Sequence, residues 1–247
     1  MQPGAEPRTS PGLYGSALLD RVDYRLAETP EDKDLIYALR YKAYLQAGLI
    51  LPSDSKRVSD HYDDAPNAWT FGIYIDGELC SALRVHVLTR EWRMSYATEL
   101  FGDILNPRLD RGEVFVDPGR FVADPERQKR FPELPYLTVR LAYLACEYFN
   151  ADSGLALVRT EHQAFYRRVF LQKIIAEPRS FPNVTRKVAL MACDYRAVRQ
   201  PVMTRFPIMQ STHFERQMLF ERHREQPPLV LDVPEFLPGH ASIASTV

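Results

Sequence analysis

The sequence predicts an α/β protein with one mixed β-sheet and helices on both of its faces. Three observations support this prediction. Segments typical of strands and helices alternate along the chain in the order β-α-β-β-β-α-β-α-β. Two early strand segments are joined by Asp76-Gly77, a dipeptide typical of a tight antiparallel hairpin. A helix separates the fourth strand segment from the fifth, as expected for the parallel part of a mixed sheet.

The first elements are a short strand and a helix with a clear start signal. Residues 22–27 (VDYRLA) form the candidate strand. Thr29 is suited to cap the following helix, Pro30 to its first turn, and the acids after Pro30 to its positive end. Gly48 is suited to end it. One side of this helix carries its apolar residues, which are Leu35, Ile36, Leu39, Ala43 and Tyr44.

Residues 69–88 form a candidate hairpin, and residues 113–126 (EVFVDPGRFVADPE) form the next strand candidate. The second run places Asp117 and Arg120 on either side of Pro118-Gly119, inside an apolar stretch. A proline in mid-strand removes a backbone donor and is tolerated at a bulge or an edge. The alternative is an Asp-Pro-Gly turn between two short strands, and the sequence leaves both interpretations open.

The second half of the chain continues the alternation. A helix that is apolar on most sides is expected over residues 134–149, with Ser153-Gly154 at its end. A strand is expected over residues 155–160, a helix over residues 161–170 and a late strand over residues 187–195.

The chain divides into three parts by composition. Residues 1–21 are rich in Pro, Gly and Ser, and we expect a loose, flexible arm. Residues 22–225 carry the alternating elements and are expected to form one domain. Residues 226–247 contain several prolines and are expected to form an extended tail.

Composition narrows the function classes. The chain has 247 residues, of which 45% are hydrophobic and 26% charged, as is ordinary for a soluble globular protein. A formal net charge of -1 gives no global attraction to nucleic acid. The 3 cysteines lack zinc-site spacing, the 6 histidines are scattered, and no metal or catalytic histidine is expected. Without a signal peptide or a membrane span, the sequence favours a cytoplasmic location.

Several charged residues break the apolar pattern of their segments. Arg40 lies on or beside the apolar stripe of the first helix, and Arg84 lies within the second hairpin strand. Asp60 and Asp63 lie just before the hairpin, where the chain must turn. Burying any one of these charges alone costs several kcal/mol, and mutual pairing recovers much of that cost. Structural salt bridges and a functional site both remain open as explanations.

The order of these residues resembles the signature of the acyl-homoserine-lactone (autoinducer) synthases. The matching residues are Arg40 and Tyr44, Asp60 and Asp63, Arg84, and Asp117 with Arg120-Phe121. RFVADPE and EHQAFYRRVF are more similar to the related long-chain N-acyl amino acid synthases. Together the similar segments cover roughly residues 24–195. The resemblance implies a GNAT-like acyltransferase fold, in which a splayed fourth and fifth strand open a cleft for a pantetheine arm. Pro118-Gly119 is suited to extend such a distortion.

The sequence departs from these families at several positions. The family acid is usually Glu, whereas this chain has Asp117, with Glu113 four residues earlier. The Trp expected after the first helix is absent, and Ile50 or Leu51 occupies that region. The span DPERQKRFPELPY contains no glycine for the loop that wraps the diphosphate of CoA in ordinary GNAT enzymes. This favours a carrier-protein donor over CoA.

Amide formation from a thioester needs a base, donors for the oxyanion and oriented reactants. We predict Asp117 as the base, with Glu113 as second choice. A backbone N–H near Phe121 or Val122 is expected to polarise the carbonyl. The guanidinium groups of Arg40, Arg84 and Arg120 are candidates to bind the substrate carboxylate. Asp60 and Asp63 are candidates to fix those arginines or to receive the ammonium group, and Tyr44 completes the candidate substrate site.

The main functional prediction is transfer of a fatty acyl group from acyl carrier protein to the amine of an amino acid or a similar small molecule. No bound cofactor is expected, and contact with a membrane surface is expected only through the acylated product. Rival interpretations are an acyl-homoserine-lactone synthase, a CoA-dependent N-acetyltransferase and a GNAT-like binding module without turnover. Carrier docking is assigned to two basic clusters, which are Arg127, Lys129 and Arg130, and Arg167, Arg168 and Lys173.

Overall fold

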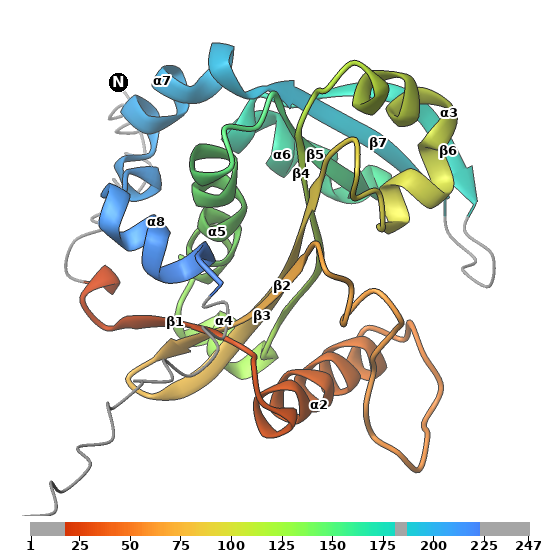
Figure 1. Ribbon diagram of the computed structural model, residues 1–247. Helices are drawn as coiled ribbons and strands as arrows, with labels where there is room; N and C mark the ends of the chain where they lie inside the picture. Colours follow the sequence, from red (N-terminus) through yellow and green to blue (C-terminus); the bar gives the residue numbers. More distant parts are fainter. Residues whose placement is uncertain (1–17, 181–186, 223–247) are drawn as a thin grey trace, which may run out of the picture.

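A seven-stranded mixed sheet forms the centre of the computed structural model, which describes residues 18–180 and 187–222. The strand order is β1-β2-β3-β4-β5-β7-β6. All neighbouring strands are antiparallel except β4 and β5, which are parallel. Helices cover both faces of the sheet, as the sequence predicts (Figure 1).

The edge of the sheet contains the predicted hairpin. Strand β1 (Val22–Leu26) pairs with β2 (Ala68–Ile75), which pairs with β3 (Glu78–Leu88). The turn residues Asp76 and Gly77 have φ angles of 52° and 79°. Two consecutive left-handed residues match the right-handed twist of the flanking strands, so the Asp-Gly signal is confirmed.

Helix α2 (Pro30–Gln46) begins at the predicted cap. The Thr29 hydroxyl accepts from the Asp32 amide at 3.1 Å, and the Asp32 carboxylate accepts from the Thr29 amide at 3.2 Å. This reciprocal pair satisfies two backbone donors at the start of the helix. Gly48, with φ of 65°, follows the helix end. The predicted apolar side of α2 packs against a cluster that includes Ala82 and Val122 of the sheet, except for Leu35, which is 54% exposed.

Strand β4 (Phe115–Ala123) is continuous, so the alternative of a turn at Pro118-Gly119 is wrong. Its register with β3 shifts where Ala82 faces Val122 and Arg84 faces Gly119, which leaves one extra residue on β4. Arg120, inside this bulge, has φ of 53°. The bulge therefore lies at Arg120-Phe121, just after the proline and glycine expected to cause it.

Strand β5 (Ser153–Val158) runs beside β4 for only two paired positions. Phe115 faces Ser153 and Val116 faces Gly154, and no further pairing follows. Beyond these pairs the two strands separate, as the resemblance to the GNAT fold implies. Ser153-Gly154 belongs to this strand and does not end the preceding helix, which corrects the sequence prediction. Asn150, with φ of 50°, lies at the actual end of that helix.

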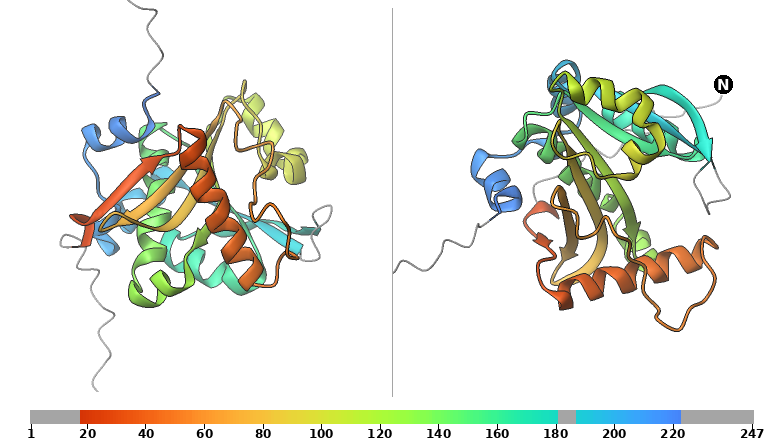
Figure 2. Two further views of the ribbon diagram at one scale, coloured as in Figure 1. Left: turned by 90° about the horizontal axis from the view of Figure 1, so that it is seen from below. Right: turned by 45° about the vertical axis from the view of Figure 1, so that its right-hand side comes forward.

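One face of the sheet is covered by α5 (Leu134–Tyr148), predicted as the most apolar helix. Leu83, Val85 and Val87 of β3 point to this face. Helices α7 (Tyr195–Arg205) and α8 (His213–Phe220) lie outside α5 (Figures 1 and 2). The buried guanidinium of Arg140 in α5 joins these layers, because it donates to the Glu215 carboxylate of α8 at 2.6 Å.

The opposite face is covered by two separate helices. Ala82 of β3 packs under α2, and Leu88 packs under α3 (Tyr96–Asp110). Figure 1 shows these two helices at opposite ends of the face. Strand side chains alternate between faces, so Arg84 and His86 point to the same face as Ala82 and Leu88. The polar middle of β3 therefore lies between the two helices.

Several elements were not predicted from the sequence. Helix α3 has a non-helical residue at Phe101. Gly102 and Pro107 disfavour a helix, so its apolar pattern was not recognised in the sequence. The edge strand β6 (Lys173–Ser180) is mostly exposed and irregular in register, so it lacks a buried strand pattern. The other missed elements are α4 (Pro125–Arg130), α7, the short helix η2 (Pro207–Met209) and α8.

The remaining predicted elements are confirmed. The helical segment over residues 161–170 is present as η1 (Thr160–His162) followed by α6 (Gln163–Phe170), and β7 (Lys187–Asp194) is the late strand. Leu18 and Leu19 pack against the main core. The rest of the expected arm, residues 1–17, and the expected tail over residues 226–247 lie outside the described residues. Within the described ranges, no helix is long and apolar enough to cross a membrane.

The hairpin turn provides a stability test. Gly77→Ala should destabilise the protein by about 1 kcal/mol, because an L side chain is strained at its positive φ, although no atom lies within 4 Å of the added Cβ. Gly119→Ala is the matched control, because its φ is ordinary and its Cβ would also meet no atom within 4 Å. Urea unfolding of both variants measures the difference, and equal losses would contradict the backbone explanation.

Candidate functional site

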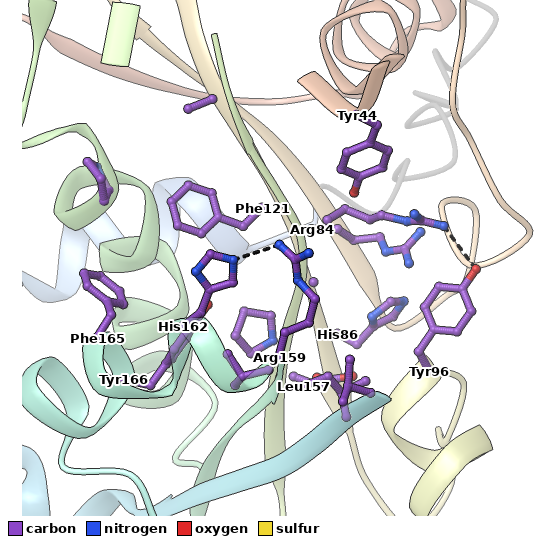
Figure 3. Close-up of a pocket in the computed structure, with 18 of the residues that line it drawn as sticks. Tyr44, Arg84, His86, Tyr96, Phe121, Leu157, Arg159, His162, Phe165 and Tyr166 are labelled. Atoms are coloured by element: carbon purple, nitrogen blue, oxygen red, sulfur yellow. Dashed lines mark hydrogen bonds between the residues drawn. The ribbon is translucent and has the colours of Figure 1, made fainter. Parts of the chain in front are cut away.

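A cavity of about 870 Å³ opens between the separated strands β4 and β5 and the polar middle of β3. Its lining includes Pro118 to Phe121 of β4 and Leu157 and Val158 of β5, which lie beyond the last β4–β5 pair. Figure 3 shows two walls: Tyr44, Arg84, His86 and Tyr96 lie on one side, and Phe121, Phe165 and Tyr166 lie on the other. The cavity therefore has a polar wall and an aromatic wall.

A buried ion-pair network forms behind the polar wall. Arg40 of α2 donates to both Asp63 carboxylate oxygens at 2.8 Å. Arg84 of β3 donates through one nitrogen to Asp60 at 2.6 Å and to Asp63 at 2.8 Å. Arg120 of β4 donates through Nε to Asp60 at 2.8 Å and through Nη2 to the same oxygen. Two carboxylates thus bind three guanidinium groups from three elements.

These pairings determine the charge state of the network. Burial alone would raise the pKa of Asp60, but hydrogen bonds and charge from Arg84 and Arg120 lower it below its usual range. Burial lowers the pKa of Arg40, and the Asp63 carboxylate opposes that effect. Asp60 therefore remains ionised at neutral pH, and the ion pairs hold the members of the network in place.

The structure brings together only part of the predicted substrate site. Tyr44, Arg84, Arg120 and Phe121 line the cavity. The other four candidates are not among its lining residues: Arg40, Asp63 and Val122 are buried behind its wall, and Asp60 is partly buried.

Asp117 is buried, with 4% of its surface exposed, and it lines the cavity. Burial raises the pKa of its carboxyl group to about 6, against the effects of a hydrogen bond from Ser95, the charge of Arg84 and the Ala97 amide. Ser95 caps α3 and Ala97 lies in its first turn. The helix that the sequence analysis missed therefore holds the predicted base.

Glu113 occupies a different place from the one expected. It accepts hydrogen bonds from Arg108 and Arg111 and does not line the cavity. Hydrogen bonding to Arg108 lowers the pKa of Glu113, although burial opposes this effect. The alternative base is therefore engaged outside the site, and Asp117 is the carboxylate of this strand that faces the cavity.

Three histidines line the cavity although the sequence analysis assigned none a role: His61, His86 and His162. They are far apart in sequence, and although His61 and His162 lie within segments that resemble the family, no role could be assigned to them from the sequence. His86 lies directly opposite Asp117 in the β3–β4 register. Burial and the charge of Arg84 lower its pKa to about 3, so His86 is neutral above this pH. Among the described residues, no cluster of three or more potential ligands could hold a metal ion.

Two further charged residues of the cavity were missed. Glu99 of α3 is exposed and accepts from the Tyr62 hydroxyl at 2.8 Å. Arg159 follows β5 and donates to His162 Nε2 at 2.9 Å. In Figure 3, Arg159 lies between His162 and His86. Glu99 belongs to the unpredicted helix, and Arg159 was included in the fifth strand without a functional interpretation.

The predicted docking residues lie on elements beside the cavity. Gln128 of α4 and Phe165 of α6 contribute to the lining, so both helices border the opening. Side chains on or next to these helices carry the two basic clusters, which are Arg127, Lys129 and Arg130, and Arg167, Arg168 and Lys173. Arg127 pairs with Glu78 at 2.5 Å and Lys129 with Glu126 at 2.8 Å.

The buried network supplies the second stability test. Asp63→Asn should destabilise the protein by about 3–5 kcal/mol, because it leaves the buried Arg40 and Arg84 poorly compensated. Asp23→Asn is the matched control, because its pair with Arg25 is exposed and screened by solvent, so the loss of stability is expected to be small. Urea unfolding checks both values, and a small loss for the Asp63 variant would show that the network is not stabilising.

Comparisons with known proteins identify the family. The model of the N-acyl amino acid synthase FeeM family matches residues 35–194, which is more than half of the chain. The structure of FeeM from uncultured soil microbes is similar, with a TM-score of 0.59, 15% identity and coverage of 74% of this chain and 96% of FeeM. No curated protein sequence matches the chain.

Two further structures share the fold. TofI, in a complex with an inhibitor and MTA, has a TM-score of 0.54 and 20% identity, covering 77% of this chain and 100% of TofI. The CoA-dependent acyl-homoserine lactone synthase BjaI has a TM-score of 0.53 and 15% identity, covering 76% of this chain and 89% of BjaI. The family match and the geometry agree: this chain belongs to the FeeM family of N-acyl amino acid synthases, acyltransferases with a GNAT-like fold.

Proposed function

We propose that the protein transfers a fatty acyl group from the thioester of acyl carrier protein to the amine of an amino acid. One observation carries this proposal: a buried carboxyl group, Asp117, lines a cavity formed where β4 and β5 separate. In this arrangement the strand opening admits the thioester from one side, and the carboxylate meets the amine on the other.

The proposed reaction between an amine and a thioester forms one bond and breaks another. The amine nitrogen attacks the thioester carbonyl carbon, a C–N bond forms, and the C–S bond breaks. The proton lost by nitrogen ends on the departing sulfur, so the step needs no oxidant and no metal. Catalysis then depends on a base for that proton, on donors for the oxyanion and on alignment of the two reactants.

Asp117 is the group best placed to be the base. Its pKa of about 6 leaves it as a carboxylate at neutral pH, while keeping it more basic than an exposed aspartate. Arg120, which is only three residues away, is bound to Asp60. A mutual Asp117–Arg120 pair would have favoured a binding module without turnover, whereas the observed pairing leaves Asp117 facing an open cavity.

The bulge in β4 is the proposed source of oxyanion donors. An extra residue in one strand interrupts the ladder and leaves backbone groups unpaired there. Arg120 and Phe121 lie between the pairs Ala82–Val122 and Arg84–Gly119, so the N–H groups of Phe121 and Val122 are the candidates. Preorganised backbone donors of this kind stabilise the charge that develops on the carbonyl oxygen.

An apolar path supports a fatty acyl substrate. A second cavity of about 40 Å³ shares Pro118, Phe121 and Tyr166 with the main one. It continues behind the strand opening between β4 and α5, where Val139 and Ala142 line it. Burial of methylene groups along such a surface contributes roughly 0.8 kcal/mol for each group. An acetyl group would leave this path unused.

The segment after β4 supports a carrier-protein donor over CoA. Diphosphates bind well at helix N-termini, where unpaired N–H groups and the helix dipole attract anions. The N-terminus of α4 is already capped by Asp124, which accepts from the amides of Glu126 and Arg127. The N-cap of α5 is Glu133, another acid. Both helix starts would repel the CoA diphosphate.

The base assignment predicts a pH profile. Asp117→Asn should lower turnover by about 10² or more, because the amide cannot accept the amine proton. The unmodified protein should lose activity as pH falls through about 6, the pKa of Asp117. The residual activity of the variant should not show this fall. Initial rates of amide formation between pH 5 and 9 test this, and wild-type activity in the variant would exclude Asp117 as the base.

Thermal unfolding of the same variant is the folding control. The folded-state pKa of Asp117 lies above the unfolded value of about 3.9, so its ionisation reduces stability as pH rises through about 6. Asparagine cannot ionise and avoids this loss. Asp117→Asn should therefore raise Tm at pH 8 relative to the unmodified protein, and this gain should shrink at pH 4.

The donor assignment predicts a salt-dependent defect. Arg130→Glu with Arg167→Glu should slow use of acyl carrier protein by about tenfold at low salt, because carrier proteins present an acidic surface. A small acyl-pantetheine thioester should still be used normally. The control is Arg25→Glu with Arg111→Glu, two exposed residues outside the cavity lining. Efficient use of acyl-CoA by the unmodified protein, without use of the carrier, would overturn the donor assignment.

A further inference from the structure

The three arginines expected to bind the substrate carboxylate already bind aspartates. Arg40 donates twice to Asp63, and Arg120 donates through Nε and Nη2 to Asp60. Nη1 of Arg84 is shared by both aspartates. Among the described residues, Nε and Nη2 of Arg40 and Nε of Arg84 have no hydrogen-bond partner, but these atoms are buried in the wall and are not exposed to a ligand. A substrate carboxylate could gain the Nε–Nη2 fork of Arg120 only by displacing its charge-assisted hydrogen bonds to Asp60.

Arg159 is the cavity arginine outside this network. Its Nη2 donates to His162 Nε2, so that nitrogen of the imidazole is an acceptor and the ring is neutral in this arrangement. Its Nη1 lies 3.2 Å from the carboxylate of Glu161, a side chain that is 48% exposed. A neutral imidazole and an exposed acid hold a guanidinium less strongly than two buried aspartates do. Arg159 can therefore accept an anionic ligand at lower cost.

The acidic residues that line the cavity lie in a different part of the fold from Arg159. Asp117 is bound at the first turn of α3, and Glu99 lies in the same helix. Arg159 and His162 instead come from the segment between β5 and α6. Figure 3 shows Tyr96 of α3 on the opposite side of the cavity from His162, with Arg159 between them. The lining acids Asp117 and Glu99 thus lie at α3, beside Arg84 and Arg120, whose charges are already paired with aspartates, and Arg159 lies at the end of β5.

From this separation of the lining acids and Arg159 we infer that Arg159 binds the α-carboxylate of the amino-acid substrate, supported by His162. The inference rests on the proposed function. The substrate ammonium group then faces Asp117 and Glu99, where it releases one proton to solvent before the neutral amine attacks. The second proton leaves the nitrogen through Asp117 and ends on the departing sulfur. An α-amino acid carries both charges on one carbon, so it matches a cavity with opposite charges on two sides. Arg40, Arg84 and Arg120 act as the framework of the polar wall, and Arg159 selects the substrate.

The test compares each amino acid with its own α-carboxamide. The twenty protein amino acids and their carboxamides are assayed with an acyl-pantetheine thioester, so that carrier docking does not contribute. For the amino acid used best, Arg159→Gln should lower kcat/KM by about 10–100-fold, because the planar fork for the carboxylate is lost. Use of the carboxamide should change less than about threefold, and Arg159→Lys should fall between.

The control is Arg196→Gln, which removes an exposed arginine of α7 that pairs with Asp152 at 3.2 Å, outside the cavity. It should leave the ratio of amino acid to carboxamide use unchanged. An unchanged ratio in Arg159→Gln, whether both activities fall together or neither falls, would overturn the assignment. Failure of the unmodified protein to acylate any amino acid would instead overturn the proposed function.

A second comparison identifies the source of the anion. The donor carries its own anion, the phosphate of the phosphopantetheine arm, and Arg159 could contact this group instead. Acyl-phosphopantetheine and acyl-pantetheine differ only in that phosphate. If Arg159→Gln raises the KM of the phosphorylated donor alone and leaves the ratio of amino acid to carboxamide use unchanged, Arg159 binds the donor, and the carboxylate assignment is wrong.

Discussion

The pairing of two buried aspartates with three arginines is the interaction on which the site depends. Arg40 and Arg84 are 0% and 1% exposed, and either charge would be costly in that environment without a carboxylate partner. Because the arginines lie on α2, β3 and β4, satisfying their charges fixes three elements around the turn at residues 60–63. Charge compensation therefore fixes the polar wall of the cavity in addition to the apolar packing of α2 on the sheet.

The same network supports the distortion of β4. A non-glycine residue with positive φ is strained, and Arg120 has φ of 53°. Its guanidinium binds Asp60 and also donates to the Tyr96 hydroxyl at 3.1 Å. These bonds offset the backbone strain and hold the bulge in place. With β4 paired to β5 only as far as Val116, the two strands remain apart beside the cavity in which the reaction is proposed to occur.

The sequence predicted those features that have a local signal. The Thr29 cap of α2, the Asp-Gly hairpin and the apolar helix α5 are determined by neighbouring residues, and all were predicted. Charges that break an apolar pattern also stood out, so the network members were identified before the structure. Glu99 and Arg159 could not be recognised in this way, because exposed charges on a helix or after a strand look like ordinary solvated residues. Their significance arises only when α3 and β5 border one cavity.

The placement of Asp117 shows how one unpredicted helix changes the chemistry of a predicted residue. Ser95 and the Ala97 amide fix its carboxyl group at the start of α3, which limits how far that group extends into the cavity. The related families usually have the longer Glu at this position, so an aspartate leaves additional space of about one methylene group. A water molecule fits the role of carrying the proton across that space, because general bases also act through one intervening water.

The burial that raises the pKa of Asp117 reduces stability at neutral pH, and the same burial makes the group basic enough to accept a proton. For Asp117 as the proposed base, stability and catalysis therefore place opposite demands on one side chain, as expected for a functional group within an otherwise well-paired site.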